Sequence, residues 1–187
     1  MRIFGIDPGS ERTGYGCIES TGSRHRLVLC GTLSGPARAT FPEKLQAIHA
    51  GLRELILRCH PDCVAVEDIF YARNVRSALK LGHARGVALL AASESSLPIC
   101  EYSPAEIKRA VVGYGRAEKP QVQHMMKLLL GLSAVPTPHD AADALAVAIC
   151  HAHASAFARA ARTAGAPQAR GRARRAATSW RTYKPAP

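Results

Sequence analysis

Four carboxylates in this sequence occupy positions from which they could act together on a metal ion. Asp7 and Glu67 each follow a short apolar run, and Asp140 and Asp143 lie three residues apart in an alanine-rich segment. Neighbouring parallel strands would bring the two strand-ending acids together, and residues three apart share one helical face. Unpaired, four converging anions would be destabilised by repulsion and desolvation. Because Mg²⁺ prefers oxygen ligands, the four acids predict a magnesium site.

Such a site is suited to phosphodiester hydrolysis, in which two metal ions roughly 3.5 to 4 Å apart activate a water and stabilise the leaving oxygen. A structural alternative exists for Asp7 as a turn residue and for Asp140 as a helix cap. Asp68 differs from its neighbour Glu67, because adjacent strand residues point to opposite faces. We therefore expect Asp68 to face solvent or a helix, away from the site.

The elements that must position these acids follow from hydrophobic periodicity and turn residues. We expect strands at 2–7, 13–19, 25–33, 63–67 and 99–102. We expect helices from Pro42 to about His60, from about Val75 to Ser95, from Ser103 to about Gly113, from Pro120 to about Leu130, and after Pro138. Ser103 to Glu106 forms a capping box with proline in the first turn. This order predicts an α/β fold, with a mixed five-stranded sheet flanked by helices on both faces.

The charge of the chain is unevenly distributed. Of 187 residues, 25 are Lys or Arg and 14 are Asp or Glu, which gives a net charge of +11. Eight of the cations and no acid lie between Phe157 and Pro187, so the preceding core carries only +3. We expect one domain at 1–157 and a basic, disordered tail at 158–187, because the tail has too few large apolar residues to fold alone. Nucleic acid is the favoured polyanionic partner.

The six cysteines favour buried free thiols. Cys59, His60 and Cys63 could suggest zinc, but no second ligand pair stands at a matching spacing. The amino terminus has no apolar secretory segment, and no apolar run is expected to span a bilayer. We expect a cytoplasmic protein with no membrane partner.

Short motifs occur along the chain in an order that resembles one family. They are Gly5-Ile6-Asp7-Pro8-Gly9-Ser10, Thr13-Gly14-Tyr15-Gly16, Ser77-Ala78-Leu79-Lys80-Leu81-Gly82, Ala84-Arg85-Gly86-Val87-Ala88, Val111-Val112-Gly113, Ala117-Glu118-Lys119 and Asp140-Ala141-Ala142-Asp143-Ala144-Leu145-Ala146. From about Met1 to His153, the chain resembles the RuvC family of bacterial Holliday-junction resolvases. The resemblance implies a ribonuclease-H-like nuclease that acts as a homodimer and nicks two opposed strands of a four-way DNA junction with Mg²⁺, in recombination and repair.

The resemblance also implies roles for individual residues. Asp7, Glu67, Asp140 and Asp143 match the catalytic acids, which would hold two Mg²⁺ ions per site, with Mn²⁺ as a substitute. Lys108 and Lys119 match lysines near the active site, where an ammonium would neutralise the phosphate or the transition state. Phe70 matches an aromatic that stacks on an unpaired junction base. Phosphate contacts would come from Arg73, Asn74, Arg76, Lys80 and Arg85.

Each of these roles has a plainer alternative. The lysines and the basic stretch could be solvated helix faces, and Phe70 could be a core residue. His139 precedes Asp140 and could transfer a proton, but a solvent-exposed loop histidine is the favoured explanation. The resemblance places an acid or a histidine at Asp140 itself, so it assigns no role to His139.

The resemblance implies further partners. They are a second copy of the chain and a branch-migration motor of the RuvA and RuvB type. A dimer contact is expected on apolar faces within Leu79–Leu90 and Val122–Leu130, although part of that surface must belong to the core.

Three other functions are compatible with part of the sequence. Gly5 to Ser10 also resembles a phosphate loop of actin-like ATPases, but the chain has no second loop of that kind and is too short for a second lobe. Another ribonuclease-H-like nuclease would use the same four acids. A non-catalytic junction-binding protein would gain nothing from acids beside phosphates.

Overall fold

A five-stranded mixed sheet forms the centre of the structure. The computed structural model describes residues 1–68 and 74–163. The strands are β1 (Arg2–Asp7), β2 (Thr13–Thr21), β3 (Arg24–Leu33), β4 (Cys63–Glu67) and β5 (Ile99–Tyr102), in the order β3-β2-β1-β4-β5. The first three form an antiparallel meander, whereas β1 pairs with β4, and β4 with β5, in parallel. The mixed five-stranded sheet expected from the sequence is confirmed, with strand ends displaced by at most two residues.

Within residues 1–68 and 74–163, five helices connect or cover these strands. They are α1 (Phe41–Cys59), α2 (Val75–Glu94), α3 (Pro104–Val112), α4 (Lys119–Leu129) and α5 (His139–Thr163). The predicted capping box begins α3: Ser103 Oγ accepts from the Glu106 amide, and the Glu106 carboxylate accepts from the Ser103 amide. Helix α1 begins with the same motif at Thr40 and Glu43. These local signals explain why helix positions were predictable.

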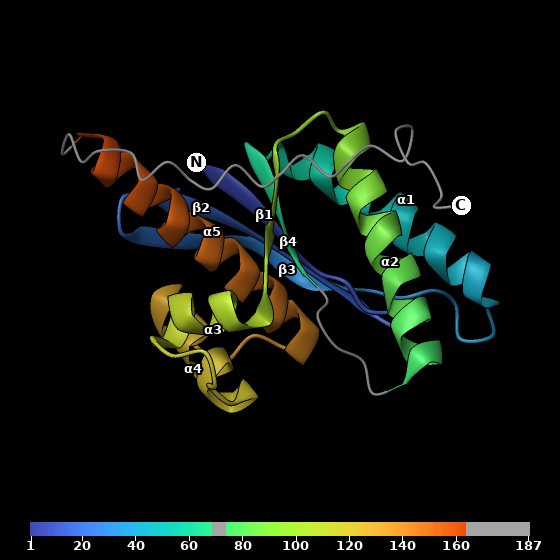
Figure 1. Ribbon diagram of the computed structural model, residues 1–187. Coiled ribbons are helices and arrows are strands. Elements are labelled where there is room, and N and C mark those ends of the chain that lie inside the picture. The colour runs from blue at the N-terminus through green and yellow to red at the C-terminus, as the bar shows by residue number, and fades with distance from the viewer. Residues whose placement is uncertain (69–73, 164–187) are drawn as a thin grey trace, which may run out of the picture. The chain divides into compact units, whose positions relative to one another are not determined.

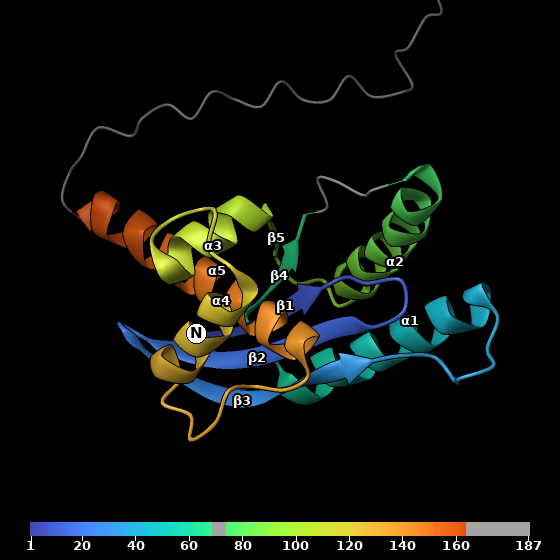
Figure 2. The same ribbon diagram turned by 90° about the horizontal axis from the view of Figure 1, so that it is seen from below.

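Helices cover both faces of the sheet. Figure 2 shows α1 and α2 on one side of the strands and α3, α4 and α5 on the other. Alternation along β1 divides its side chains between two cores, with Ile3 facing α5 and with Phe4 and Ile6 facing α1 and α2. On β4, Ala65 and Val66 divide in the same way. Asp7 is four residues after Ile3 and Glu67 two residues after Ala65, so both acids are on the face of the sheet that α5 covers.

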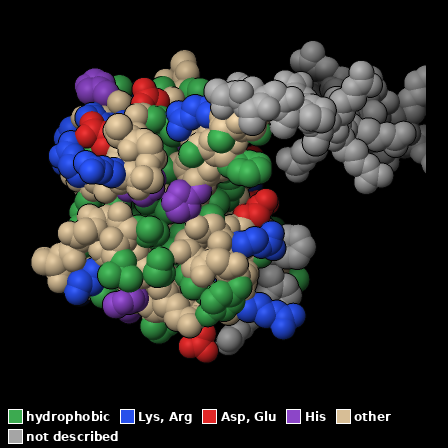
Figure 3. Space-filling model, turned by 90° about the vertical axis from the view of Figure 1, so that its left-hand side faces the viewer, with side chains coloured by type: hydrophobic (Ala, Val, Ile, Leu, Met, Phe, Trp, Pro, Cys, Tyr) green, Lys and Arg blue, Asp and Glu red, His purple; other side chains and the backbone are tan. Residues whose placement is uncertain are grey.

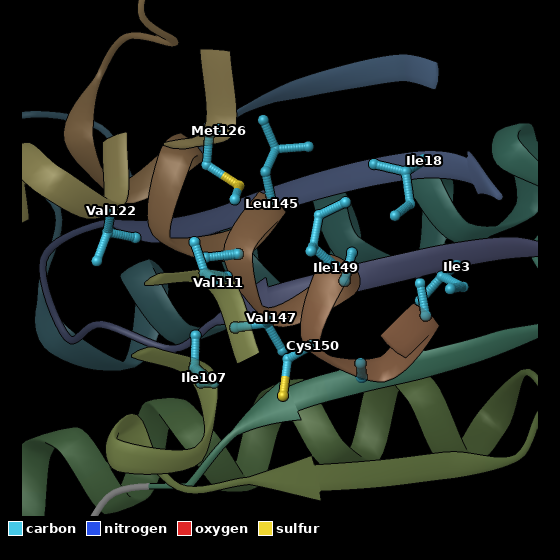
Figure 4. Packing of buried hydrophobic residues seen from close by; sticks show 14 of the residues in the cluster. Ile3, Ile18, Ile107, Val111, Val122, Met126, Leu145, Val147, Ile149 and Cys150 are labelled. Carbon is cyan, nitrogen blue, oxygen red and sulfur yellow. The ribbon is translucent and has the colours of Figure 1, made fainter. Parts of the chain in front are cut away.

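Helix α5 packs closely across β1 and β2 (Figure 1). A Cβ atom on Gly5 would lie 2.2 Å from the Ala144 carbonyl oxygen, and one on Gly14 would lie 2.0 Å from the Asp140 carbonyl oxygen. Gly5 pairs with Gly16 in the β1–β2 register, so the sheet offers a strip without side chains to the helix backbone. Figure 4 shows Leu145 and Ile149 of α5 pointing into the core beside this strip. The glycines therefore determine how near α5 approaches the strands.

The composition of α5 corrects one expectation. Residues 139–161 form a helix that is long and apolar enough to cross a bilayer by length and composition alone, contrary to the prediction that no such run exists. The reason is its high alanine content. Much of that length is buried, and residues from Ala141 to Ala152 pack in the core beside the sheet. Its apolarity is that of a core helix.

The chain divides into compact units at Met1–Ser155 and Ala156–Pro187. Residues 164–187, most of the expected tail, lie outside the described residues, so the domain boundary near 157 and the state of the tail stay predictions. The six cysteines are free thiols, and four of them are buried. Cys59 and Cys63 belong to cores on opposite faces of the sheet, which does not favour a shared zinc ion.

Candidate active site

Two of the four acids stand at neighbouring strand ends. Asp7 is the last residue of β1 and Glu67 the last of β4, and these strands are parallel, with Ile6 opposite Val66. The two carboxyl groups are within hydrogen-bonding reach of each other. The sequence argument that parallel strands would bring them together is therefore matched by the geometry.

The first turns of α5 supply the other two acids. Carboxylate oxygens of Asp7, Asp140 and Asp143 all lie within 4.8 Å of one another. The close contact between Gly14 and the Asp140 backbone holds the start of the helix above the end of β1. Because Asp140 and Asp143 are three residues apart, both face the strand ends. All four predicted acids converge.

The local electrostatics disfavour full ionisation of this cluster. Burial raises the pKa of Asp7 well above its ordinary 3.8, and the nearby charges of Glu67, Asp143 and Asp140 raise it further. Burial also raises the pKa of Glu67, while the hydrogen bond from Asp7 acts in the opposite direction. Without a cation, the pair therefore tends to retain a proton between its carboxyl groups.

A cavity of about 710 Å³ opens beside the acids at the carboxyl ends of β1 and β4. It is lined by Asp7, Pro8, Glu67, Asp68, Leu81, Ser103, Pro104, Ala105, Ile107, Lys108, Lys119, Val122, Asp143 and Ala146. The side chain of Lys119, at the start of α4, lies 3.0 Å from an Asp143 oxygen, and this hydrogen bond raises the Lys119 pKa. Lys108 of α3 also lines the cavity, and its charge lowers the Glu67 pKa. Both predicted lysines thus border the acids.

Asp68 points toward α2, as strand parity requires. It lies 3.1 Å from Arg85, which also pairs with Glu101 of β5. Asp68 faces a helix, as predicted, but the prediction that it faces away from the site is wrong, because Asp68 lines the same cavity as Glu67. Sequence reasoning missed this ion-pair network, because no local spacing connects the three residues.

The residues predicted to contact DNA have different surroundings. Asn74 caps α2 by accepting from the Ser77 amide, Arg76 is exposed, and Lys80 lies 5.5 Å from the centre of the Phe41 ring. Phe70 and Arg73 lie outside the described residues, so their roles stay predictions. Arg85, by contrast, is held between two acids.

His139 begins α5, and its Nδ1 is hydrogen-bonded to the side-chain amide of Gln123 on α4. His139 is exposed, as the plainer alternative proposed, but it lies at the start of a helix and not in a loop, whereas Gln123 is buried. Gln123 was not predicted as part of the site. The feature that could have identified Gln123 is its position three residues before buried Met126, which places a polar side chain on the same helical face.

Known proteins resemble this chain along most of its length. Residues 3–151 match the family "Crossover junction endodeoxyribonuclease RuvC". The chain belongs to the RuvC family. A RuvC from Desulforamulus reducens is 51% identical over 152 residues, which cover 81% of this chain and 93% of the relative. A RuvC from Chloroflexus aggregans is 52% identical over 153 residues, or 82% and 93% of the two chains.

Solved structures agree with the RuvC assignment. The Thermus thermophilus RuvC structure superimposes with a TM-score of 0.77 at 36% identity and covers 84% of this chain and 97% of its own. T. thermophilus RuvC has also been solved in complex with a Holliday junction substrate, with a TM-score of 0.77 at 34% identity, over 84% and 96% of the chains. The ribonuclease-H-like fold implied by the resemblance is confirmed.

Proposed function

We propose that this RuvC chain is a magnesium-dependent endodeoxyribonuclease that resolves four-way DNA junctions by paired, symmetric nicks during homologous recombination and repair. The convergence of Asp7, Glu67, Asp140 and Asp143 beside an open cavity, in a chain of this family, carries the proposal. The relative from T. thermophilus was solved with a Holliday junction substrate.

The acids fit a site for two Mg²⁺ ions, with Mn²⁺ as a substitute. Three carboxylates lie within 4.8 Å of one another, Glu67 is beside Asp7, and this all-oxygen donor set suits hard cations. When bound, the ions would supply an activated water and stabilise the leaving oxygen of the phosphodiester. The residues' own contribution is to hold the ligands in place before substrate arrives, because the sheet and α5 fix their backbones.

The two lysines would neutralise the negative charge of a phosphate in the cavity. Lys108 and Lys119 line the same cavity as the acids and are the positively charged residues of its described lining. A fixed ammonium stabilises the negative charge that develops at a phosphate during hydrolysis. Lys119 is positioned for this role by its ion pair with Asp143.

Contacts to the junction come from the start of α2 and the segment before it. Arg76 and Lys80 are exposed cations suited to phosphates, and Asn74 is exposed at the N-cap, where its side-chain oxygen accepts from the Ser77 amide. The resemblance adds Phe70 for base stacking and Arg73 for a phosphate. On the face of the core seen in Figure 3, Lys and Arg side chains lie in separate groups, so positioning must depend on individual cations there.

A homodimer would present two sites to a two-fold substrate. The surface that supports it is one side of α2, where Val75, Leu79 and Leu90 are 76%, 60% and 52% exposed. A Cβ on Gly82 or Gly86 of the same stripe would meet no atom within 4 Å, so another helix could approach closely. On α4 and at its C-cap Leu130, part of the expected contact surface is unavailable, because Val122, Met126 and Leu130 are buried. The proposed setting is the cytoplasm, with a branch-migration motor of the RuvA and RuvB type as partner.

One experiment tests the proposed function. The purified chain is incubated with a mobile four-way junction, a linear duplex and an RNA–DNA hybrid, each with and without Mg²⁺. Paired nicks in the junction alone, dependent on Mg²⁺, are expected. Cleavage of the hybrid or the duplex would identify a different ribonuclease-H-like nuclease, and junction binding without cleavage would identify a binding protein.

A further inference from the structure

The end of β4 is held asymmetrically where Glu67 leaves the sheet. The last backbone pair between β1 and β4 is Ile6 with Val66, so no β1 residue stands opposite Glu67 in the sheet register. On the other side, Glu67 is opposite Tyr102, and the Asp68 amide donates to the Tyr102 carbonyl oxygen at 2.8 Å. The strand end that carries a proposed metal ligand is therefore supported by β5 alone within the sheet.

A charged network from α2 supplies a second support. Asp68 and Glu101 both point toward α2, since Glu101 is opposite Val66 and Asp68 is two residues beyond it. Arg85 lies between them and pairs with both carboxylates. Leu81, one helical turn before Arg85, lines the cavity together with Asp68. This face of α2 therefore adjoins the end of β4.

Arg85 is a partly buried residue that connects two half-exposed acids, since the Asp68 and Glu101 side chains are 47% and 46% exposed. Its side chain is 23% exposed, and its Nε is buried with no hydrogen-bond partner in the described part of the chain. A guanidinium can serve two carboxylates at once through its planar set of donors. To contact a DNA phosphate, Arg85 would have to leave Asp68, which lines the cavity, and Glu101 of β5 without this ion pair.

We propose that Arg85 is a positioning residue, which acts through Asp68 and Glu101 to hold the end of β4 so that Glu67 faces Asp7. This inference rests on the proposed function of Glu67 as a metal ligand. It differs from the DNA contact that the family resemblance implies for Arg85. The outer partners of metal ligands commonly change metal affinity by roughly 10- to 100-fold when they are removed.

The test measures metal binding by the full chain without DNA. The melting temperature is followed as Mg²⁺ alone is titrated, for wild type, Arg85→Met, Asp68→Asn and the double variant. Each single variant is expected to raise the half-saturating Mg²⁺ concentration about tenfold. The double variant is expected to match the singles, because both remove one connection. Arg85→Lys should restore part of the affinity, since an ammonium retains the charge without the planar fork.

If Arg85 and Asp68 affected Mg²⁺ binding only through their charges, the two substitutions would change the Mg²⁺ affinity in opposite directions. Removing the Arg85 cation would then tighten Mg²⁺ binding, and removing the Asp68 anion would weaken it, so that result would overturn the proposal. Unchanged Mg²⁺ binding in Arg85→Met, with weaker junction binding and a smaller salt dependence, would instead make Arg85 a DNA contact. Because no DNA is present in the titration, failure of the junction-cleavage assay would be a separate result.

Arg2→Met is the matched structural control. Arg2 lies at the opposite end of β1 and pairs with Glu19 at 2.7 Å. Its loss should lower the melting temperature without changing the half-saturating Mg²⁺ concentration. A shift in Arg2→Met equal to that in Arg85→Met would mean that general destabilisation explains both, and the positioning role would be rejected.

Discussion

The ionisation of Asp7 links the active site to the stability of the metal-free protein. Burial and neighbouring acids raise its pKa above 3.8, so the folded state binds more protons than the unfolded state as pH increases past that value. The free energy of unfolding therefore falls as pH rises through the window between 3.8 and the raised pKa. The Asp7→Asn variant has no carboxyl group at this position, so its free energy of unfolding does not decrease in this way.

We accordingly expect Asp7→Asn and wild type to melt alike near pH 4 in EDTA. As pH increases, the variant should become more stable by roughly 1 kcal/mol, or about 2 to 4 °C. Differential scanning calorimetry across pH checks the prediction. An equal difference at every pH would mean that proton binding at Asp7 does not contribute.

Substitution of the other acids should separate binding from catalysis. Glu67→Gln, Asp140→Asn and Asp143→Asn are each expected to lower the single-turnover cleavage rate by about 10²-fold or more, as does removal of a transition-state-stabilising group. Junction affinity should be retained, because an amide removes repulsion from phosphate. Glu54→Gln, an exposed acid on α1, is the control with unchanged rate. Loss of the gel shift together with activity would instead indicate a structural role.

The position of the start of α5 depends on Gly14, where this helix contacts the β1–β2 pair. Gly14→Ala would place a methyl group 2.0 Å from the Asp140 carbonyl oxygen, so the start of α5 must move away from Asp7. We expect a cost of about 1 to 3 kcal/mol, a melting temperature lower by about 3 to 10 °C, and reduced Mg²⁺ affinity. Gly115→Ala, whose Cβ would meet nothing closer than 3.4 Å, is the control. Normal Mg²⁺ affinity in Gly14→Ala would refute this positioning.

For the helices and strands, the sequence predicted the features that depend on residues near one another along the chain. Strand alternation, the capping box at Ser103 and the i, i+3 spacing of Asp140 and Asp143 specified the elements and the acids' faces. What could not be predicted depends on tertiary packing: Val122 and Met126 of α4 are in the core whereas Leu128 is exposed, and Arg85 meets Asp68, just after β4, and Glu101 of β5. The apolarity of α5 likewise indicates its burial only once the sheet beside it is known.

The molecule as a whole should act as a symmetric pair. Mixing wild type with an excess of Asp7→Asn should yield heterodimers with one working site, which leave junctions nicked on one strand. Denaturing and native gels of the same reactions distinguish single from paired nicks. A monomer in analytical ultracentrifugation, together with undiminished paired nicking in the mixture, would exclude the dimer.

The basic tail should add affinity without selectivity. Residues 164–187 contain six cations and no acid, so they can neutralise phosphates and release counterions. Deleting them while keeping α5 intact should decrease the slope of log affinity against log salt by about 0.9 for each phosphate that the tail neutralises. The preference for junction over duplex should stay the same. A changed preference at constant salt would make the tail a recognition element.

The four acids come from the first strand, the fourth strand and the last helix of the described chain, and this has a consequence for the time at which the enzyme becomes active. The proposed metal site cannot form until α5 has emerged and packed against β1, because Asp140 and Asp143 are part of α5. A growing chain therefore carries Asp7 and Glu67 through most of its synthesis without being able to cut DNA. A chain truncated before α5 therefore lacks two of the four acids, whereas a chain that ends after α5 retains all of them.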